Sequence, residues 1–273
     1  MDRKAESKGP GKAYKNEEFI DTRDARPLRI LAEYLEPEAR FKRLHVHDTI
    51  IFCGSARTLS KDEASAALET AKAEGGNVRH AEMQLHMARY YEDARTLAHR
   101  LSEWSMNLDR RERRFLVCTG GGPGIMEAAN RGASEANALN IGLTISMPTE
   151  EFDNPYVTRD LSFEFHYFFM RKFWFSYMAK AVVVMPGGFG TLDEFFELMT
   201  LIQTLKMKKR PPIVLFGSEF WSKVLDLEAL ASFGTIDEQD LDLFLRTDSV
   251  DEAFDFITSE LATIGLSDSG PSL

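Results

Sequence analysis

The chain has 273 residues and a mass of 31.0 kDa, enough for one large domain with extensions without requiring a second domain. Hydrophobic residues make up 44% and charged residues 28%, so we expect a buried core and exclude wholesale disorder and a disulfide scaffold. The 33 Lys and Arg residues against 43 Asp and Glu give a net charge of −10, which provides no general attraction to nucleic acid or anionic membranes.

The N-terminal segment cannot form a hydrophobic core. Residues 1–15 carry five Lys/Arg and two acids, with no apolar stretch behind them, so neither a signal peptide nor folded structure is expected there. Residues 16–43 should form one or two short helices, interrupted at Pro37, that pack on the main domain. We therefore expect a tail and helical extension over 1–45, a main domain over 46–262 and a C-terminal tail over 263–273.

The main domain alternates strands with helices. Apolar runs rich in β-forming residues predict strands at 48–53, 115–119, 141–146, 181–185 and 213–216. Helical segments are expected at 61–75, 79–107, 124–138, 168–180, 191–206, 219–231 and 250–261. This alternation predicts an α/β protein with a Rossmann-like, three-layer arrangement, in which helices cover both faces of a parallel sheet and ligands bind at the carboxyl ends of the strands.

Two features of the chain indicate its surroundings. The long helix at 79–107 has one apolar seam, which either packs on the sheet or forms a subunit interface. The seam consists of Met83, Met87, Tyr90, Ala94, Leu97, Leu101, Trp104 and Leu108. Cys53 and Cys118 each end an apolar run and are expected to be reduced packing thiols, which fits a cytoplasmic protein. No run of about 18 apolar residues occurs, so no membrane partner is expected.

Three glycine-containing loops, at 54–55, 120–124 and 187–190, each follow a predicted strand and lead toward a helix. The N-terminus of a helix presents unpaired N–H groups, and glycines let an anion approach the backbone, so these loops could hold a phosphate. Tight strand-to-helix turns also need glycine for purely conformational reasons. No GxxxxGK[ST] or GxGxxG pattern is present, and no acid ends the strand at 141–146. A phosphorylated mononucleotide is therefore favoured over NAD(P).

The most specific string is PGGFGTLDE, which runs from Pro186 to Glu194. Arg171 and Lys172 precede it on a predicted helix, and Arg171 lies 194 − 171 = 23 residues before Glu194. With the Gly54-Ser55 turn, these motifs resemble the Lonely Guy family, long labelled lysine decarboxylases, over roughly residues 46–260. The chain looks more like the longer bacterial branch, because it adds about 45 N-terminal residues and its Gly120 loop is one residue shorter than in short plant-type members. Phe169 and Met170 stand where those members have His and a polar residue, which argues against a cytokinin-specific role.

The resemblance implies a nucleoside-5′-monophosphate phosphoribohydrolase, which breaks the N-glycosidic bond of an AMP-like nucleotide or cytokinin ribotide. The products are the free base and ribose 5-phosphate, and no cofactor is implied. Such a reaction needs a carboxylate near an oxocarbenium-like sugar, which suits Glu194, with Arg171 across the site as the second catalytic residue. The expected substrate-binding residues are Gly54, Ser55, Gly121, Gly122, Lys172, Gly187, Gly188, Gly190 and Thr191.

Each candidate has a structural alternative. Thr191 to Glu194 also reads as a capping box, in which Glu194 would only bind the backbone at the start of a helix. Arg171 and Lys172 could be a solvated basic pair, although their apolar surroundings argue against it. His166 is more simply a structural histidine at a strand end than a catalytic acid.

Other classes of function fit less well. A pyridoxal-phosphate decarboxylase would need a Schiff-base lysine facing the cofactor, and neither Lys172 nor Lys180 has the expected partner. No metal-binding motif is present, so no metal is expected. The main alternative is a carrier on the same fold that holds a phosphorylated ligand such as molybdenum cofactor without hydrolysing it. The family resemblance and the many aromatic residues in helices also predict a homodimer or larger homo-oligomer.

Overall fold

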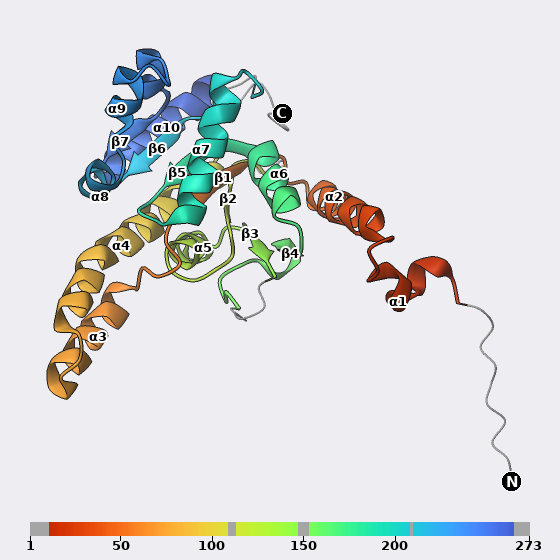
Figure 1. The fold of residues 1–273 in the computed structure, drawn as a ribbon, viewed down its shortest axis with the longest axis horizontal. Helices are drawn as coiled ribbons and strands as arrows, with labels where there is room; N and C mark the ends of the chain where they lie inside the picture. The colour runs from red at the N-terminus through yellow and green to blue at the C-terminus, as the bar shows by residue number, and fades with distance from the viewer. Residues whose placement is uncertain (1–10, 109–112, 147–152, 208–209, 265–273) are drawn as a thin grey trace, which may run out of the picture.

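The computed structural model describes residues 11–108, 113–146, 153–207 and 210–264 as one α/β fold (Figure 1). Its centre is a seven-stranded sheet in the order β4-β3-β2-β1-β5-β6-β7, with every neighbouring pair parallel. The strands are β1 (Thr49–Cys53), β2 (Leu116–Thr119), β3 (Asn140–Ile145), β4 (Ser162–Phe165), β5 (Ala179–Val184), β6 (Ile213–Phe216) and β7 (Leu245–Thr247). The predicted Rossmann-like fold class is confirmed.

Ten α-helices and three 3-10 helices accompany the sheet in the described residues. The α-helices are α1 (Glu17–Ile20), α2 (Arg26–Arg43), α3 (Lys61–Glu74), α4 (Val78–Met106), α5 (Ile125–Glu135), α6 (Phe168–Met178), α7 (Phe189–Gln203), α8 (Ser218–Val224), α9 (Leu227–Ser232) and α10 (Val250–Ile264). The 3-10 helices are η1 (Ala13–Lys15), η2 (Arg159–Leu161) and η3 (Glu238–Leu243). No helix in these ranges is long and apolar enough to cross a membrane.

All five predicted strands are present, and the structure adds the outermost two. β1, β2, β5 and β6 are buried at every position, as continuous apolar runs in a sheet covered on both faces should be. β4 alternates exposed and buried residues, and β7 has only three residues. Neither edge strand has the apolar run by which the central strands are recognised, so both were missed in the sequence.

The course of the chain through the sheet fixes where a ligand site can form. From β1 the chain builds outward through β2 and β3 to β4, and then returns to place β5 on the other side of β1. The direction of winding therefore reverses between β1 and β5, and the carboxyl ends of these two strands flank the reversal. In open α/β sheets a crevice forms at this point, which makes it the expected ligand position.

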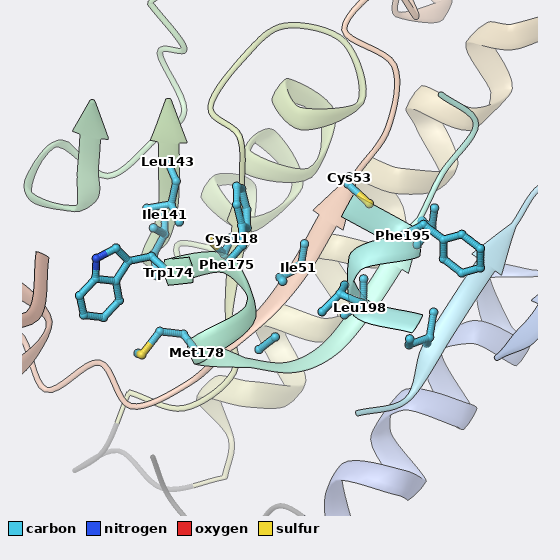
Figure 2. Close-up of a cluster of buried hydrophobic side chains, with 14 of the residues drawn as sticks. Ile51, Cys53, Cys118, Ile141, Leu143, Trp174, Phe175, Met178, Phe195 and Leu198 are labelled. Atoms are coloured by element: carbon cyan, nitrogen blue, oxygen red, sulfur yellow. The ribbon is translucent and has the colours of Figure 1, made fainter. Parts of the chain in front are cut away.

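Two apolar layers hold the helices on the sheet. On one face, side chains of α6 and α7 such as Trp174, Phe175 and Phe195 pack with Ile51 and Cys118 from the strands (Figure 2). On the other face, α4, α5 and α10 pack on alternate strand residues, including Ile50. The site at the end of β1 is thus held between helices from both layers.

The apolar seam of α4 is used mainly for packing on the sheet. Tyr90, Ala94, Leu97 and Leu101 are buried in the core, whereas Met83 near the N-terminal end of the helix is exposed. Figure 1 shows this end of α4 and the adjoining α3 extending beyond the sheet. Of the two predicted roles, packing on the sheet is therefore the one that the middle of the seam has.

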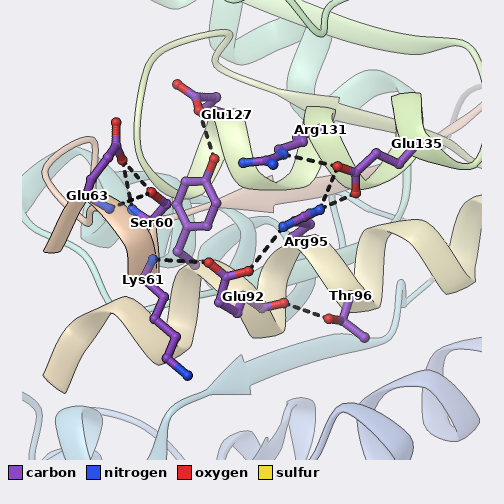
Figure 3. A network of polar contacts seen from close by, with 10 residues as sticks. Ser60, Lys61, Glu63, Glu92, Arg95, Thr96, Glu127, Arg131 and Glu135 are labelled. Carbon is purple, nitrogen blue, oxygen red and sulfur yellow. Dashed lines mark hydrogen bonds and ion pairs between the residues drawn. The ribbon is translucent and has the colours of Figure 1, made fainter. Parts of the chain in front are cut away.

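A polar network fastens α3, α4 and α5 to one another (Figure 3). Ser60 and Glu63 form a capping box at the start of α3, and Glu92 of α4 accepts a hydrogen bond from the backbone N–H of Lys61. Arg95 of α4 then makes two hydrogen bonds of 2.7 Å to the carboxylate of Glu135 on α5. These contacts fix the helix whose first turn borders the candidate site.

The predicted interruption at Pro37 is wrong, because α2 continues through it from Arg26 to Arg43. Proline lacks the N–H that would bond to the carbonyl of Glu33 four residues earlier. The indole Nε1 of Trp174 on α6 donates to that carbonyl at 3.0 Å and replaces the missing bond. The Glu33 carboxylate also accepts from the backbone N–H of His166 at 2.8 Å, so α2 is tied to α6 and to the end of β4.

Other boundaries differ slightly from prediction. The helix expected at 219–231 is two helices, α8 and α9, because Asp226 leaves the helix and caps the second by accepting from the N–H of Ala229. Phe41 of α2 belongs to the apolar core, so the expected helical extension packs on the main domain. The proposed domain limits remain a prediction, and residues 1–10 and 265–273 of the expected tails lie outside the described residues.

Candidate active site

Three loops meet at the carboxyl end of the central strands, and all three were predicted as phosphate-loop candidates. The backbone N–H of Ser55 after β1 donates to the carbonyl of Pro186 after β5 at 3.0 Å. The carbonyl of Ser55 in turn accepts from the N–H of Ile125, at the start of α5, at 3.0 Å. The Gly54-Ser55 turn therefore joins the other two loops into one surface.

Several of the glycines are required by the packing of these loops. Gly124 has φ +69°, and a Cβ atom there would lie 2.4 Å from the carbonyl oxygen of Ser55. A Cβ on Gly121 would lie 2.5 Å from Thr144, and one on Gly54 would lie 2.6 Å from Ile125. The conformational explanation is thus sufficient for Gly54, Gly121 and Gly124. A Cβ on Gly122 would meet only the flexible end of a methionine.

The loop before α7 differs because part of it faces open space. No atom lies within 4 Å of a Cβ placed on Gly188 or Gly190, whereas one on Gly187 would clash with the Thr191 hydroxyl at 2.1 Å. Gly188 is the N-cap of α7, and no side chain caps this end of the helix. The first turn of α7 therefore presents backbone N–H groups beside open space, which is the arrangement that binds anions.

The capping-box alternative for Glu194 is wrong. α7 begins at Phe189, two residues earlier than predicted, so Thr191 is the third helical residue and not the N-cap. Glu194 then lies in the second turn, beyond reach of the groups that a capping box satisfies. Its carboxylate is free to serve another purpose.

Glu194 faces Arg171 across the gap between α7 and α6. The Nη2 atom of Arg171 lies 3.8 Å from Oε1 of Glu194, and their side chains are 14% and 19% exposed, respectively. The sequence separates these residues by 194 − 171 = 23 positions, and the packing of α6 and α7 on the same face of the sheet brings them together. The structure thus forms the pair that the motif predicts.

Burial dominates the electrostatics of this pair. Desolvation raises the pKa of Glu194 from 4.5 to about 7, although the positive charges of Arg171 and Lys172 act in the opposite direction. Burial likewise lowers the pKa of Arg171 despite the neighbouring carboxylates. Both pKa shifts agree with the 3.8 Å distance between Arg171 and Glu194, which is longer than a direct hydrogen bond. The side chain of Cys53 lines the same pocket as Glu194 and acts to lower this pKa, a proximity that the sequence did not predict, while its thiol donates to the carbonyl of Val183 at 3.7 Å.

Arg171 packs against aromatic rings, and not all of its N–H groups donate a hydrogen bond. Its guanidinium carbon lies 5.1 Å from the ring centre of Phe168 and 5.8 Å from that of Phe175, within cation–π range. Its Nε atom is buried and has no hydrogen-bond partner. A Cβ on Gly120 would lie 3.8 Å from Nη1, so the guanidinium also borders the loop after β2. The solvated-pair alternative does not describe Arg171.

Lys172 is engaged elsewhere. Its Nζ lies 2.8 Å from Oδ2 of Asp193 and 3.2 Å from Oε2 of Glu197, both on α7. These ion pairs tie α6 to α7 beside the Arg171–Glu194 pair. A direct role for Lys172 in substrate binding stays a prediction, while its described contacts are those of a residue that positions the two helices.

The remaining candidate residues are the two cysteines, which pack in the core, and His166, which lies at the surface. Cys53 and Cys118 are free and buried, which confirms that they are packing thiols, and burial raises the pKa of both. His166 is exposed directly after β4, where its ring meets that of Tyr167 edge-on. Among the residues that the structure describes, no group of three or more His, Cys, Asp or Glu side chains could hold a metal ion.

Comparison with known proteins identifies the chain's relatives. A sequence model of the family described as "Possible lysine decarboxylase" matches residues 126–257. The match confirms the resemblance to Lonely Guy proteins, which have carried that label. The family segment includes Arg171, Glu194 and the loop before α7, but it begins after β1 and Gly124. A search of curated protein sequences gives no match.

Solved structures resemble this chain at low sequence identity. The X-ray structure of TM1055, a structural-genomics target, has 19% identity and a TM-score of 0.47, with 78% of this chain and 99% of that chain covered. The molybdenum cofactor carrier protein of Chlamydomonas reinhardtii has 20% identity and a TM-score of 0.46, with 79% of this chain and 99% of that chain covered. Similarity at this level concerns the fold alone.

Proposed function

We propose that the protein hydrolyses the N-glycosidic bond of a nucleoside 5′-monophosphate to a free base and ribose 5-phosphate. One observation carries the proposal: a largely buried carboxylate, Glu194, faces Arg171 from the second turn of a helix whose glycine-lined N-terminus is uncapped. The helix end suits a phosphate and the carboxylate suits a developing positive charge. A 5′-phosphorylated sugar has both groups.

In this mechanism the phosphate binds at the first turn of α7 and fixes the ribose between α6 and α7. The ionised carboxylate of Glu194 stabilises the oxocarbenium-like sugar as the bond between C1′ and the base nitrogen breaks. Glu194 also orients a water molecule, whose hydroxyl adds to C1′ and whose remaining proton reaches the departing base. Arg171 orients the ribose or the carboxylate through the donors that it does not use elsewhere.

Pyridoxal-phosphate chemistry, which the family description would suggest, does not fit the lysines near this site. Lys172 is paired with Asp193 and Glu197. Lys180 is the second residue of β5 and is buried at the opposite end of that strand from the loop before α7. Neither amine is directed to the α7 N-terminus, where a phosphorylated cofactor would be anchored.

A direct screen tests the proposal. Purified protein is incubated with each nucleoside 5′-monophosphate, and free base is measured by chromatography. We expect base release from AMP or another nucleotide, with adenosine a far poorer substrate in kcat as well as KM, because phosphate binding energy also positions the sugar. Equal rates on adenosine and AMP would contradict the role of the α7 loop. Tightly bound pterin, seen by fluorescence, without base release from any nucleotide would instead support the carrier alternative.

A further inference from the structure

The first turn of α6 carries two adjacent phenylalanines with nearly equal exposure. Phe168 is 56% exposed and Phe169 is 55% exposed. Successive helical residues point about 100° apart, so the two rings face different surroundings. The ring of Phe169 packs against Tyr167, with 5.5 Å between ring centres. The ring of Phe168 lies instead against the Arg171 guanidinium.

Phe168, Arg171 and Phe175 form a stripe along α6, since they are spaced by three and four residues. Phe175 is buried at the inner end of the stripe and Phe168 is exposed at the outer end. The guanidinium lies between the two rings. The ring of Phe168 is thus an exposed aromatic surface directly beside the Arg171 guanidinium.

We propose that Phe168 stacks on the aromatic base of the bound nucleotide and thereby sets a preference for large planar bases. This inference rests on the proposed function. In the proposed complex the phosphate lies at the start of α7 and the ribose lies against the Glu194–Arg171 pair. The base then projects toward the exposed end of the α6 stripe. A phenyl ring offers a flat apolar surface without hydrogen-bond readout, so it favours a purine over the smaller pyrimidine by contact area.

Binding of fragments separates the base from the rest of the substrate. We would measure dissociation constants by calorimetry for AMP, CMP and ribose 5-phosphate, together with kcat and KM for AMP. Phe168→Ala should weaken AMP binding by about tenfold or more, the scale of one base–aromatic stacking contact. Ribose 5-phosphate binding should be unchanged, the AMP-over-CMP preference should fall, and the loss should appear mainly in KM. Phe168→Trp should restore AMP binding.

Phe169→Ala is the matched control, because it removes an equally exposed ring from the adjacent position. We expect it to change AMP binding less than twofold, and thermal melting should confirm that both alanine variants fold. Equal losses for Phe168→Ala and Phe169→Ala, or equal weakening of AMP and ribose 5-phosphate by Phe168→Ala, would overturn the stacking role. If the wild-type protein binds AMP without hydrolysing it, the proposed activity fails while the binding comparison still decides the role of Phe168. Failure of the wild-type protein to bind AMP overturns both proposals.

Discussion

At the scale of single residues, the proposed activity depends on the negative charge of the Glu194 carboxylate, which is largely shielded from water. We predict that Glu194→Gln lowers kcat by about 10²-fold or more while retaining much of the affinity for nucleotide, because the negative charge acts mainly in the transition state. Single-turnover rates and equilibrium binding measure the two effects separately. A variant with near wild-type kcat would remove Glu194 from the mechanism.

The raised pKa of the same carboxyl predicts a pH dependence. The proposed mechanism needs the ionised form, and burial raises the pKa of Glu194 to about 7. The value of kcat/KM should therefore increase with pH and level off above about pH 7. A rate profile that is flat from pH 5 to about 8, a range centred near that pKa, would contradict this prediction.

Stability should change with pH in the opposite sense. Because folding raises this pKa above its ordinary value of 4.5, the folded protein binds the proton more tightly than the unfolded chain does. The resulting destabilisation is absent below about pH 4.5 and complete above about pH 7, with a size on the order of 3 kcal/mol. Denaturant titrations should accordingly find Glu194→Gln more stable than wild type at pH 8 and similar to it at pH 4.5.

Individual residues also show how much of the candidate site could be predicted from the sequence. The motif predicted Glu194 and Arg171 as partners, and the structure places them 3.8 Å apart. It did not predict the thiol of Cys53 beside the carboxylate, since this contact depends on the pairing of β1 with β5 over a long separation in sequence. Phe168 was passed over because one phenylalanine among several in an apolar helix gives no signal of what it contacts.

At the scale of elements, local pattern located the central strands and most helices, but it misplaced one helix start and predicted a helix interruption that does not occur. The string TLDE resembles a helix start, yet α7 begins at Phe189 because the preceding glycines allow the helix to start without a side-chain cap. Pro37 resembles a helix break, yet Trp174, 137 residues later (174 − 37), supplies the missing donor. No local rule contains the contact with Trp174.

The bond to Glu33 can be tested with a pair of substitutions. Trp174→Phe should destabilise the protein by roughly 1–3 kcal/mol, because it removes a donor and leaves the Glu33 carbonyl without one. Adding Pro37→Ala restores a backbone N–H four residues after Glu33, so the double variant should recover part of the loss. Urea denaturation of the two single variants and the double variant gives the coupling energy. Strict additivity would show that the indole and the missing N–H do not share this carbonyl.

At the scale of the whole molecule, apolar surface remains outside the two cores. Half-exposed leucines, Leu28, Leu31 and Leu35, form a stripe on α2 at helical spacing. Phe189, at the first position of α7, is 93% exposed. Surface of this kind is commonly covered by another subunit. We predict a homodimer or larger homo-oligomer, and light scattering that finds a strict monomer at micromolar concentration would contradict it.

The position of β1 in the centre of the sheet has a consequence for how the protein is made. β1 lies between β2 and β5, and its last residue, Cys53, is paired with Val184. During synthesis, one edge of β1 must wait until β5 has left the ribosome, about 130 residues after β1 (184 − 53 = 131). Pairing over such a distance is slow and leaves an unpaired strand edge in the meantime. The site should thus appear only in the last stage of folding, and chains interrupted before residue 179 should be aggregation-prone as well as inactive.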